Sequence, residues 1–250
     1  LSKKLAEDID GLVLDVKVGS GAFMKDEASA RRLAESLVRV GSGAGLNVTA
    51  LLTRMEEPLG TMVGNALEVR ESIDILQGVG PQDSTELTLA LGAEMLVLGK
   101  IAEDVEHARE ILAQKIQGGE ALDKFQALIE AQGGDGSVVD DPDRLPSASF
   151  KTEITSHESG YVEKIDAYQI GTSATALGAG RETAEDSVDP AVGIELRVKC
   201  GSWVDKGTIL AIAHHNKPLG LVRDEIEKSF IFSDAFPKEH SLVIAKIVPN

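Results

Sequence analysis

A glycine-rich segment from Asp15 to Met24 is the first place where this sequence could bind a small molecule. It reads Asp-Val-Lys-Val-Gly-Ser-Gly-Ala-Phe-Met and follows a short apolar run. Small residues let a backbone approach a ligand closely, and a turn after a parallel strand is where α/β proteins bind ligands. The segment is neither a Walker loop nor a dinucleotide fingerprint. Its pattern therefore leaves a ligand loop and a plain tight turn equally open.

Two further segments carry groups that could act on a ligand. Lys3 and Lys4 place two ammonium groups near the start of the chain, although a solvated helix face explains such a pair more simply. The segment from Pro58 to Glu71 combines a loop with free carbonyl groups and a carboxylate. Such oxygens are the ligands that a hard monovalent cation prefers. Spacing alone favours the simpler alternative, an amphipathic helix whose glutamates face water.

The histidines do not form a metal-binding set in the sequence. His107 and His157 are isolated, and His214 and His215 are adjacent, so that in a strand they would point to opposite faces. We expect the histidines at the surface or at a sheet edge. No Ser-His-Asp or Cys-His arrangement has local support, so we predict no catalytic nucleophile from the protein.

Composition restricts the partners. The net charge of −16 repels a polyanion, which makes nucleic-acid polymers poor partners, whereas a small anion can still bind through backbone N–H groups or one lysine. No apolar run approaches the roughly 20 residues of a membrane helix, so no membrane partner is predicted. Cys200 is the only cysteine and excludes an internal disulfide. We therefore expect a cytoplasmic protein.

The first half of the chain has the pattern of an α/β domain. Apolar runs at 11–17 and 46–52 predict buried strands, and the helical spacing of 25–40 between them predicts a parallel β-α-β unit. Four more helices are expected from periodicity and capping signals, at 63–76, 83–99, 103–116 and 120–131.

The second half alternates like a set of short strands after a turn-rich stretch at 133–143. Strands are expected at 152–154, 160–165, 192–198, 208–212 and 241–248, with a helix at 222–230. The predicted fold class is α/β. A large α/β domain with a parallel or mixed sheet and flanking helices is followed by a C-terminal α+β module with a barrel-sandwich-like sheet.

Together these segments resemble the thymidine and pyrimidine-nucleoside phosphorylase family. The matches keep their order and separation over essentially the whole chain, at 2–7, 14–24, 58–60, 64–71, 131–135 and 177–181. The form of 58–71 and of 133–146 is closer to the bacterial pyrimidine-nucleoside type. The resemblance implies a small helical domain and a large α/β domain with the active site between them. Residues 1–8 would end the helical domain, 9–145 would belong to the central α/β domain, and 146–250 would form the C-terminal α+β domain.

The resemblance also implies an activity and its residues. Such a pentosyltransferase of nucleoside salvage uses phosphate to split a pyrimidine nucleoside or deoxynucleoside into free base and a sugar 1-phosphate. Lys3 would hydrogen-bond a carbonyl group of the base and Phe23 would pack against it, whereas Ser2 does not match the substrate serine of the family. Leu59 and Met62, through backbone carbonyl groups, and Glu71, through its carboxylate, would ligate a potassium ion.

Two alternatives remain open in the sequence. The part of the family chain with the phosphate loop and the dimer-forming helices is absent here, so we expect a homodimer through those helices and an inactive fragment without them. The tail at 198–212 also resembles biotinyl and lipoyl carriers, with Lys206 as a possible attachment lysine. Lys206 lies in a polar Asp-Lys-Gly turn without a neighbouring Met, which disfavours a carrier.

Overall fold

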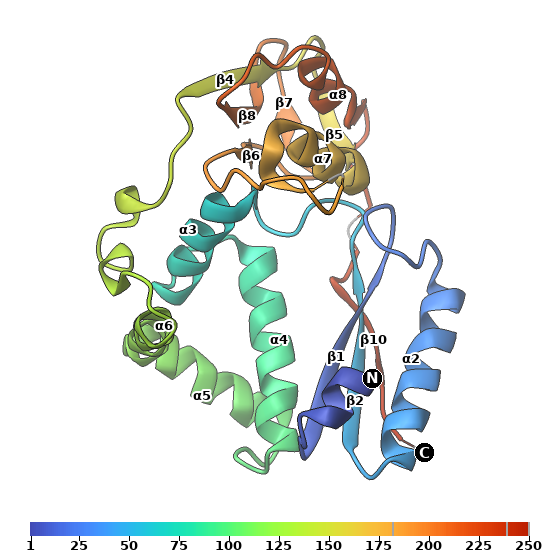
Figure 1. The fold of residues 1–250 in the computed structure, drawn as a ribbon. Coiled ribbons are helices and arrows are strands. Elements are labelled where there is room, and N and C mark those ends of the chain that lie inside the picture. The colour runs from blue at the N-terminus through green and yellow to red at the C-terminus, as the bar shows by residue number, and fades with distance from the viewer. Residues whose placement is uncertain (182, 239, 250) are drawn as a thin grey trace. The chain divides into compact units, whose positions relative to one another are not determined.

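The computed structural model describes residues 1–181, 183–238 and 240–249 and divides into two compact units (Figure 1). The first unit contains Leu1–Met55, Gln82–Gly118 and His240–Asn250, and the second contains Glu56–Pro81 and Gly119–Glu239. Each unit therefore joins segments that are far apart in the sequence. The predicted domain ranges 1–8, 9–145 and 146–250 divide the chain differently and stay a prediction.

A three-stranded mixed sheet forms the centre of the first unit. Its order is β1 (Gly11–Val18), β2 (Asn47–Arg54) and β10 (Val243–Ile247). β1 runs parallel to β2, and β10 runs antiparallel to it. Helix α2 (Glu27–Gly43) connects the two parallel strands, so the predicted β-α-β unit is confirmed. The predicted strand at 241–248 exists as β10, and it pairs with β2 of the first unit.

Helix α2 begins and packs for local reasons that the sequence shows. The Asp26 carboxylate accepts a hydrogen bond from the backbone N–H of Ser29 at 2.8 Å, which caps the first turn. Ala30, Ala34 and Val38 follow at four-residue spacing and are buried on one face of the helix. That face packs on apolar side chains of β1 and β2, namely Val16, Val18, Val48, Ala50 and Leu52.

Three more helices complete the first unit: α1 (Ser2–Ala6), α4 (Gln82–Leu98) and α5 (Val105–Gln117). α4 and α5 pack on each other through small buried side chains, Ala93 on α4 and Ala108 on α5. The buried carboxylate of Glu94 on α4 pairs with the ammonium of Lys246 on β10 at 2.6 Å. This ion pair ties α4 to the C-terminal strand of the sheet.

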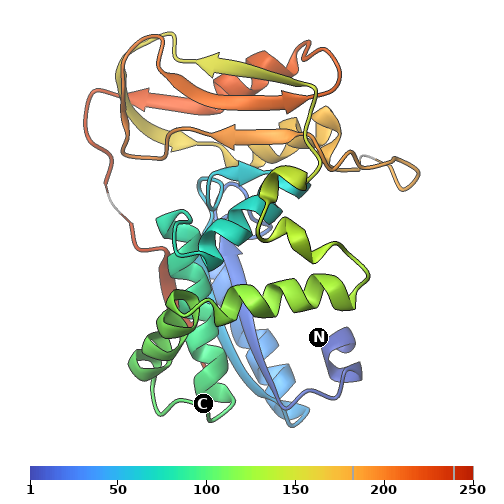
Figure 2. The ribbon, with the colours of Figure 1, turned by 90° about the vertical axis from the view of Figure 1, so that its left-hand side faces the viewer.

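Two antiparallel sheets and four α-helices build the described part of the second unit. One sheet has the order β3 (Met62–Val63), β6 (Gly193–Leu196), β8 (Ile209–His215) and β4 (Phe150–Thr155), and the other has the order β7 (Trp203–Val204), β5 (Gly160–Ile165) and β9 (Phe230–Ser233). The strands lie in layers across the top of Figure 2. The helices are α3 (Asn65–Leu76), α6 (Glu120–Ala131), α7 (Ala167–Ala174) and α8 (Val222–Lys228).

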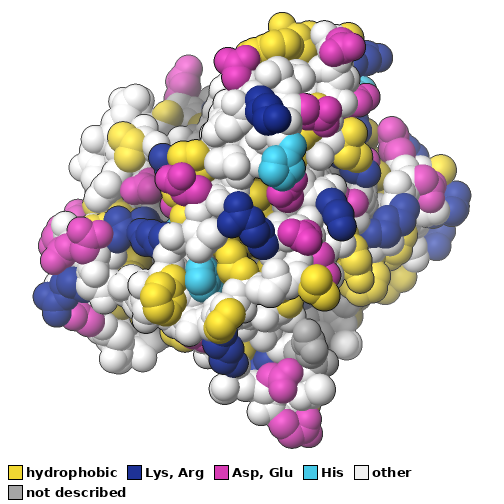
Figure 3. All heavy atoms as spheres, turned by 90° about the horizontal axis from the view of Figure 1, so that it is seen from above, with side chains coloured by type: hydrophobic (Ala, Val, Ile, Leu, Met, Phe, Trp, Pro, Cys, Tyr) yellow, Lys and Arg dark blue, Asp and Glu magenta, His cyan; other side chains and the backbone are white. Residues whose placement is uncertain are grey.

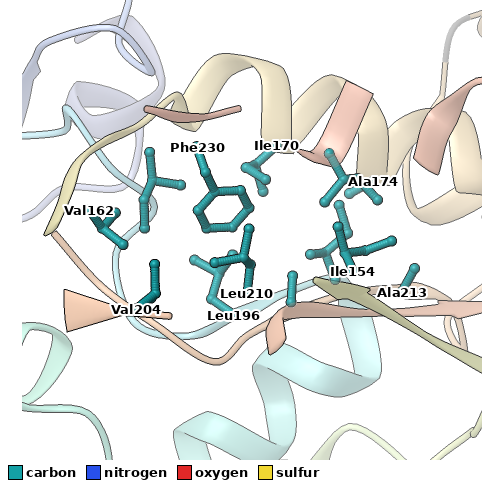
Figure 4. Close-up of a cluster of buried hydrophobic side chains, with 13 residues drawn as sticks. Ile154, Val162, Ile170, Ala174, Leu196, Val204, Leu210, Ala213 and Phe230 are labelled. Atoms are coloured by element: carbon teal, nitrogen blue, oxygen red, sulfur yellow. The ribbon is translucent and has the colours of Figure 1, made fainter. Parts of the chain in front are cut away.

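The core of the second unit lies between these sheets and helices α7 and α8. Figure 4 shows the Phe230 ring among Val162, Leu196 and Leu210, with Ile170 of α7 above it. Burial of such a set contributes about 1.5–3 kcal/mol for each large side chain. A strand-built core covered by helices is the C-terminal α+β module that the sequence predicts, and the predicted α/β fold class is confirmed.

Three local predictions for the second half are incomplete or wrong. Helix α7 was not predicted, since Gly171 and its hydroxyl-bearing neighbours have weak helix propensity. The helix expected to reach residue 230 ends at Lys228, and Phe230 begins strand β9. His214 and His215 were expected at the surface, but both are buried. β8 lies between β6 and β4, so the two histidines are on a central strand and not at a sheet edge.

Within the described part of the chain, no helix has the length and apolar character needed to cross a bilayer. Figure 3 shows acidic and basic side chains interspersed on one face of the molecule, with no single-sign patch over that view. The net negative charge is therefore distributed rather than gathered there.

Candidate functional site

The loop after β1 is closed by its own backbone. The Gly19 N–H donates to the Met24 carbonyl at 3.0 Å, and the Ala22 N–H donates to the Gly19 carbonyl at 3.0 Å. Gly19 has a φ of 134°, a conformation that glycine adopts without steric cost. The Gly21 N–H also donates to the Met55 carbonyl at the end of β2. The loop therefore has a defined shape at the carboxyl end of two parallel strands.

This loop presents one large apolar side chain to solvent. Phe23 is 100% exposed, whereas the neighbouring Ala22 is buried. An exposed aromatic ring on a fixed backbone loses little conformational freedom when a flat molecule stacks on it. The structure thus leaves Phe23 available for the base contact that the sequence predicts for it.

A polar cluster lies on β1 and β2 just before the loop. The Lys17 ammonium contacts the Asp15 carboxylate at 2.6 Å and donates to the Thr53 hydroxyl oxygen at 3.0 Å. The Thr53 hydroxyl donates to Asp15 in turn, and Thr53 is fully buried. This cluster has no signal in the sequence, because Thr53 lies 36 residues from Lys17. The parallel register, which places Lys17 opposite Thr53, brings the two together.

Lys3 lies on α1, and its side chain is exposed. Figures 1 and 2 both show α1 joined by a short segment to the lower, amino end of β1, whereas the loop with Phe23 follows the opposite, carboxyl end of that strand. No residue of α1 is buried, so packing of its own side chains does not fix the direction in which Lys3 points. The base contact predicted for Lys3 stays a prediction.

The second candidate site is the loop that precedes α3, and it is closed around a carboxylate. Glu71 is 7% exposed, and its Oε2 atom accepts hydrogen bonds from Thr61 N (2.7 Å), Thr61 Oγ1 (2.8 Å) and Met62 N (3.1 Å). Leu59 lies in the same loop and is half-buried. The structure therefore gathers Leu59, Met62 and Glu71, the three predicted potassium ligands, in one segment.

Gly60 lets the loop approach the carboxylate. Its φ is +68°, and a Cβ atom at this position would lie 1.9 Å from Glu71 Oε1. No Lys, Arg or His within the described ranges forms an ion pair with Glu71. Burying a carboxylate is favourable only where it is hydrogen-bonded and paired with a cation, and the donors seen here are neutral. That arrangement fits a cation held beside the loop.

Lys199 binds carbonyl groups of the same loop. Its ammonium donates to the carbonyl oxygens of Pro58 at 2.5 Å and Gly60 at 3.0 Å, and it lies 3.6 Å from Glu57 Oε2. The Cys200 N–H donates to Glu57 Oε2 at 3.0 Å. The role of Lys199 has no signal in the sequence, because about 140 residues separate it from the loop and only the tertiary fold brings them together.

Two family models match this chain in regions that together contain both loops and Lys199. Residues 1–122 match the glycosyl transferase family a/b domain, and residues 161–231 match the pyrimidine nucleoside phosphorylase C-terminal domain. Proteins named pyrimidine-nucleoside phosphorylase from Bacillus subtilis (strain 168) and Staphylococcus aureus (strain USA300) are each 48% identical over 217 residues. The chain belongs to the pyrimidine-nucleoside phosphorylase family.

The predicted family resemblance is thus confirmed, with one limit on its extent. The aligned region covers 87% of this chain but 50% of each relative, so the chain spans about half the length of the curated relatives it matches. The five predicted site residues lie within the first matched domain, and they are Lys3, Phe23, Leu59, Met62 and Glu71.

The remaining candidate groups do not resemble a covalent or metal centre. Burial, with a further contribution from Glu57, raises the pKa of the Cys200 thiol to about 12, so the thiol stays protonated at neutral pH and is a poor nucleophile. Among the described residues, no group of three or more His, Cys, Asp and Glu side chains is arranged to hold a metal ion. Lys206 is exposed in the turn between β7 and β8, and its N–H donates to Ser159 Oγ at 2.9 Å.

Proposed function

We propose that this protein is a pyrimidine-nucleoside phosphorylase, a pentosyltransferase of nucleoside salvage. It would convert a pyrimidine nucleoside or deoxynucleoside and phosphate into free base and ribose or deoxyribose 1-phosphate. The observation that carries the proposal is the 48% identity over 217 residues to proteins named for this activity. The two matched domains favour this reading over a lipoyl or biotinyl carrier, since neither is described as a carrier.

The chemistry needs no nucleophile from the protein. A phosphate oxygen forms a bond to the anomeric carbon while the bond from that carbon to the ring nitrogen breaks. The electron pair of the broken bond leaves with the base, whose carbonyl oxygens gain negative charge. A donor aimed at such an oxygen acts more strongly in the transition state than in the substrate, which is the condition for faster reaction.

We assign that donor to Lys3 and the base contact to Phe23. The Lys3 ammonium would donate to a pyrimidine carbonyl group, and its exposure leaves it available for that bond. Phe23 would lie against the ring and orient it, since an aromatic face recognises a flat heterocycle without specifying its substituents. Both assignments come from the match of these positions to the family pattern.

We further propose that a potassium ion is held by the carbonyl groups of Leu59 and Met62 and by the carboxylate of Glu71. The buried position of Glu71 and the absence of an ion-pair partner for it among the described residues support this. When bound, the ion would neutralise the carboxylate and hold the loop in one arrangement. Glu71→Ala should abolish the potassium response of the activity, whereas Asp74→Ala on the same helix should retain it. An unchanged response in Glu71→Ala would remove this part of the proposal.

The test of the activity follows release of uracil or thymine from uridine and thymidine by chromatography, with and without phosphate. We expect base release that requires phosphate and yields the sugar 1-phosphate in equal amount. Base release at the same rate without phosphate would indicate a hydrolase and overturn the proposal.

Two further properties, the oligomeric state and the cellular location, accompany the proposed function. We propose a homodimer, as the family resemblance implies, to be checked by light scattering on the purified protein. We also propose a cytoplasmic location, because a chain with one cysteine gains nothing from an oxidising compartment. Fractionation of the source cells checks the location.

A further inference from the structure

Lys199 binds the Pro58–Met62 loop through carbonyl groups that are not among the proposed potassium ligands. Its Nζ atom lies 2.5 Å from the Pro58 oxygen and 3.0 Å from the Gly60 oxygen. The proposed potassium ligands in the loop are the carbonyl groups of Leu59 and Met62. The two sets alternate along the loop and share no atom.

The charge of Lys199 is matched where it binds. Glu57 Oε2 lies 3.6 Å from the ammonium, and the same oxygen accepts the N–H of Cys200 at 3.0 Å. Lys199 and the adjacent Cys200 therefore both join the segment around the loop to the same turn of the C-terminal module. The Lys199 side chain is 26% exposed, so water screens the pair only in part.

Gly60 lies next to both charged side chains, Lys199 and Glu71. Its carbonyl oxygen accepts a hydrogen bond from Lys199, and its α-carbon faces the Glu71 carboxylate so closely that no Cβ would fit. A displacement of the Gly60 peptide would therefore also displace the peptide groups of Thr61 and Met62 that bind Glu71. The position of the loop relative to the carboxylate depends on what Lys199 holds.

We propose that Lys199 is a positioning residue for the monovalent-cation site. It fixes the Pro58 and Gly60 carbonyl groups so that the carbonyl groups of Leu59 and Met62 stay directed to one ion beside Glu71. This inference rests on the proposed function, since it concerns the ion proposed there. Groups that orient metal ligands without touching the metal typically change affinity by about 10–100-fold when they are removed.

Positioning and charge make opposite predictions for the loss of Lys199. If the ammonium only repelled a neighbouring cation, Lys199→Met would tighten potassium binding, because Glu57 would be left uncompensated. If it positions the loop, potassium binding weakens. The double variant Glu57→Gln/Lys199→Met leaves the net charge unchanged and keeps an acceptor for the Cys200 N–H. Weaker potassium binding in this double variant would therefore result from the loss of loop positioning and not from a change in net charge.

The experiment measures the rise in melting temperature with potassium concentration, at constant ionic strength with N-methylglucamine as the replacing cation. This readout does not require turnover, since an ion that binds the folded state raises its stability. We expect the potassium midpoint to rise about tenfold in Lys199→Met and in the double variant. Lys228→Met, which removes an exposed lysine from the same unit, should keep the wild-type midpoint, and Lys199→Arg should recover most of it.

The outcomes separate this inference from the function on which it rests. A potassium response in the wild type that is unchanged or tighter in Lys199→Met and in the double variant overturns the positioning role alone. A wild type without any potassium response overturns the cation site and this inference together, whatever the phosphorolysis assay shows. If Lys199→Met does not fold, Lys199→Arg and Glu57→Gln decide in its place. The positioning role of Lys199 would be contradicted if the potassium midpoint stayed at the wild-type value in Glu57→Gln and rose in Lys199→Arg. Arginine retains hydrogen-bond donors for the loop carbonyl groups, so it should not raise the midpoint.

Discussion

The loop after β1 and the loop before α3 both contain glycines at left-handed φ, yet the two are held in different ways. The Gly19–Met24 loop is closed by backbone hydrogen bonds and leaves Phe23 fully exposed. The Pro58–Met62 loop is bound by two charged side chains, Glu71 about ten residues along the chain and Lys199 about 140 residues along it. The first loop leaves a side chain open to solvent, and the second is held by charged groups of the protein itself.

This difference predicts where substitutions in each unit will be felt. A change to Lys3 or Phe23, the exposed residues of the first unit to which we assign substrate contacts, should lower activity and leave the folded state intact. A change in the second loop alters buried charged and hydrogen-bonded groups, so it costs stability first. Activity and stability should therefore separate the two regions.

The largest effect is expected for Lys3→Met. The substitution removes the proposed donor to the base, and loss of one such electrostatic donor typically lowers kcat by about 10²–10³. Because Lys3 is exposed, the urea midpoint of unfolding should not change. Steady-state kinetics with uridine and thymidine, with denaturation in parallel, measures both quantities.

Lys4→Met is the matched control for Lys3. The Lys4 ammonium pairs with Glu7 at 2.9 Å on the exposed face of α1, and such surface pairs contribute about 0–1 kcal/mol. Its kinetics should stay at the wild-type level. Equal losses in the two variants would mean that the charge of α1 matters rather than one directed ammonium, and the assignment of Lys3 would fall.

The next effect belongs to the second loop. Gly60→Ala would place a Cβ atom 1.9 Å from Glu71 Oε1 at a φ of +68°, so we expect a loss of roughly 2–4 kcal/mol in unfolding free energy. Gly45→Ala is the control in the first unit, since its φ is +88° and nothing lies within 4 Å of the added atom. It should cost only the backbone term, about 1–2 kcal/mol. Equal losses would show that the second loop relaxes without strain.

Much of the fold could be predicted from local patterns. The apolar runs at 11–17 and 46–52 correspond to β1 and β2 because strands with both faces covered are continuously apolar. The helix expected at 120–131 has the bounds of α6. Helix α7 was not predicted, because its local signal is weak. The strand at 241–248 was predicted, but its pairing with β2, about 190 residues before it, was not.

The site was predictable only where its members are neighbours in sequence. Leu59, Met62 and Glu71 lie within 13 residues of one another, so a family pattern could gather them. Lys199 and Thr53 gave no such signal, since each meets its partners only through the fold. The buried histidine pair was predicted wrongly for the same reason, because the sequence does not show that β8 is a central strand.

A smaller effect, confined to substrate binding, is expected for Phe23→Ala. Loss of the exposed ring should raise KM by about tenfold and change kcat little, since stacking on a base contributes roughly 1–3 kcal/mol and acts on substrate and transition state alike. Stability should not fall, because the ring is fully exposed. Leu221→Ala, at a residue of the second unit that is 78% exposed, is the control and should leave KM unchanged. A drop in stability in Phe23→Ala would show that the ring packs in the folded protein, which contradicts its description as an exposed side chain.

The smallest effect distinguishes the two units by pH. Burial lowers the pKa of His214 below its usual range, although the hydrogen bond to Glu195 opposes this, and Lys151 and His215 add to the lowering. The His214 side chain therefore binds a proton more readily in the unfolded chain than in the folded one. The free energy of unfolding falls as the pH drops from the pKa of the unfolded state toward that of the folded state. Hydrogen exchange, corrected for intrinsic rates, should show the amides of β8 losing protection between pH 7.5 and 5.5 by more than those of β2. In His214→Gln this excess should disappear, because glutamine does not titrate. If the excess persists in that variant, the pH response of the second unit comes from its carboxylates, and the buried histidine does not distinguish the two units.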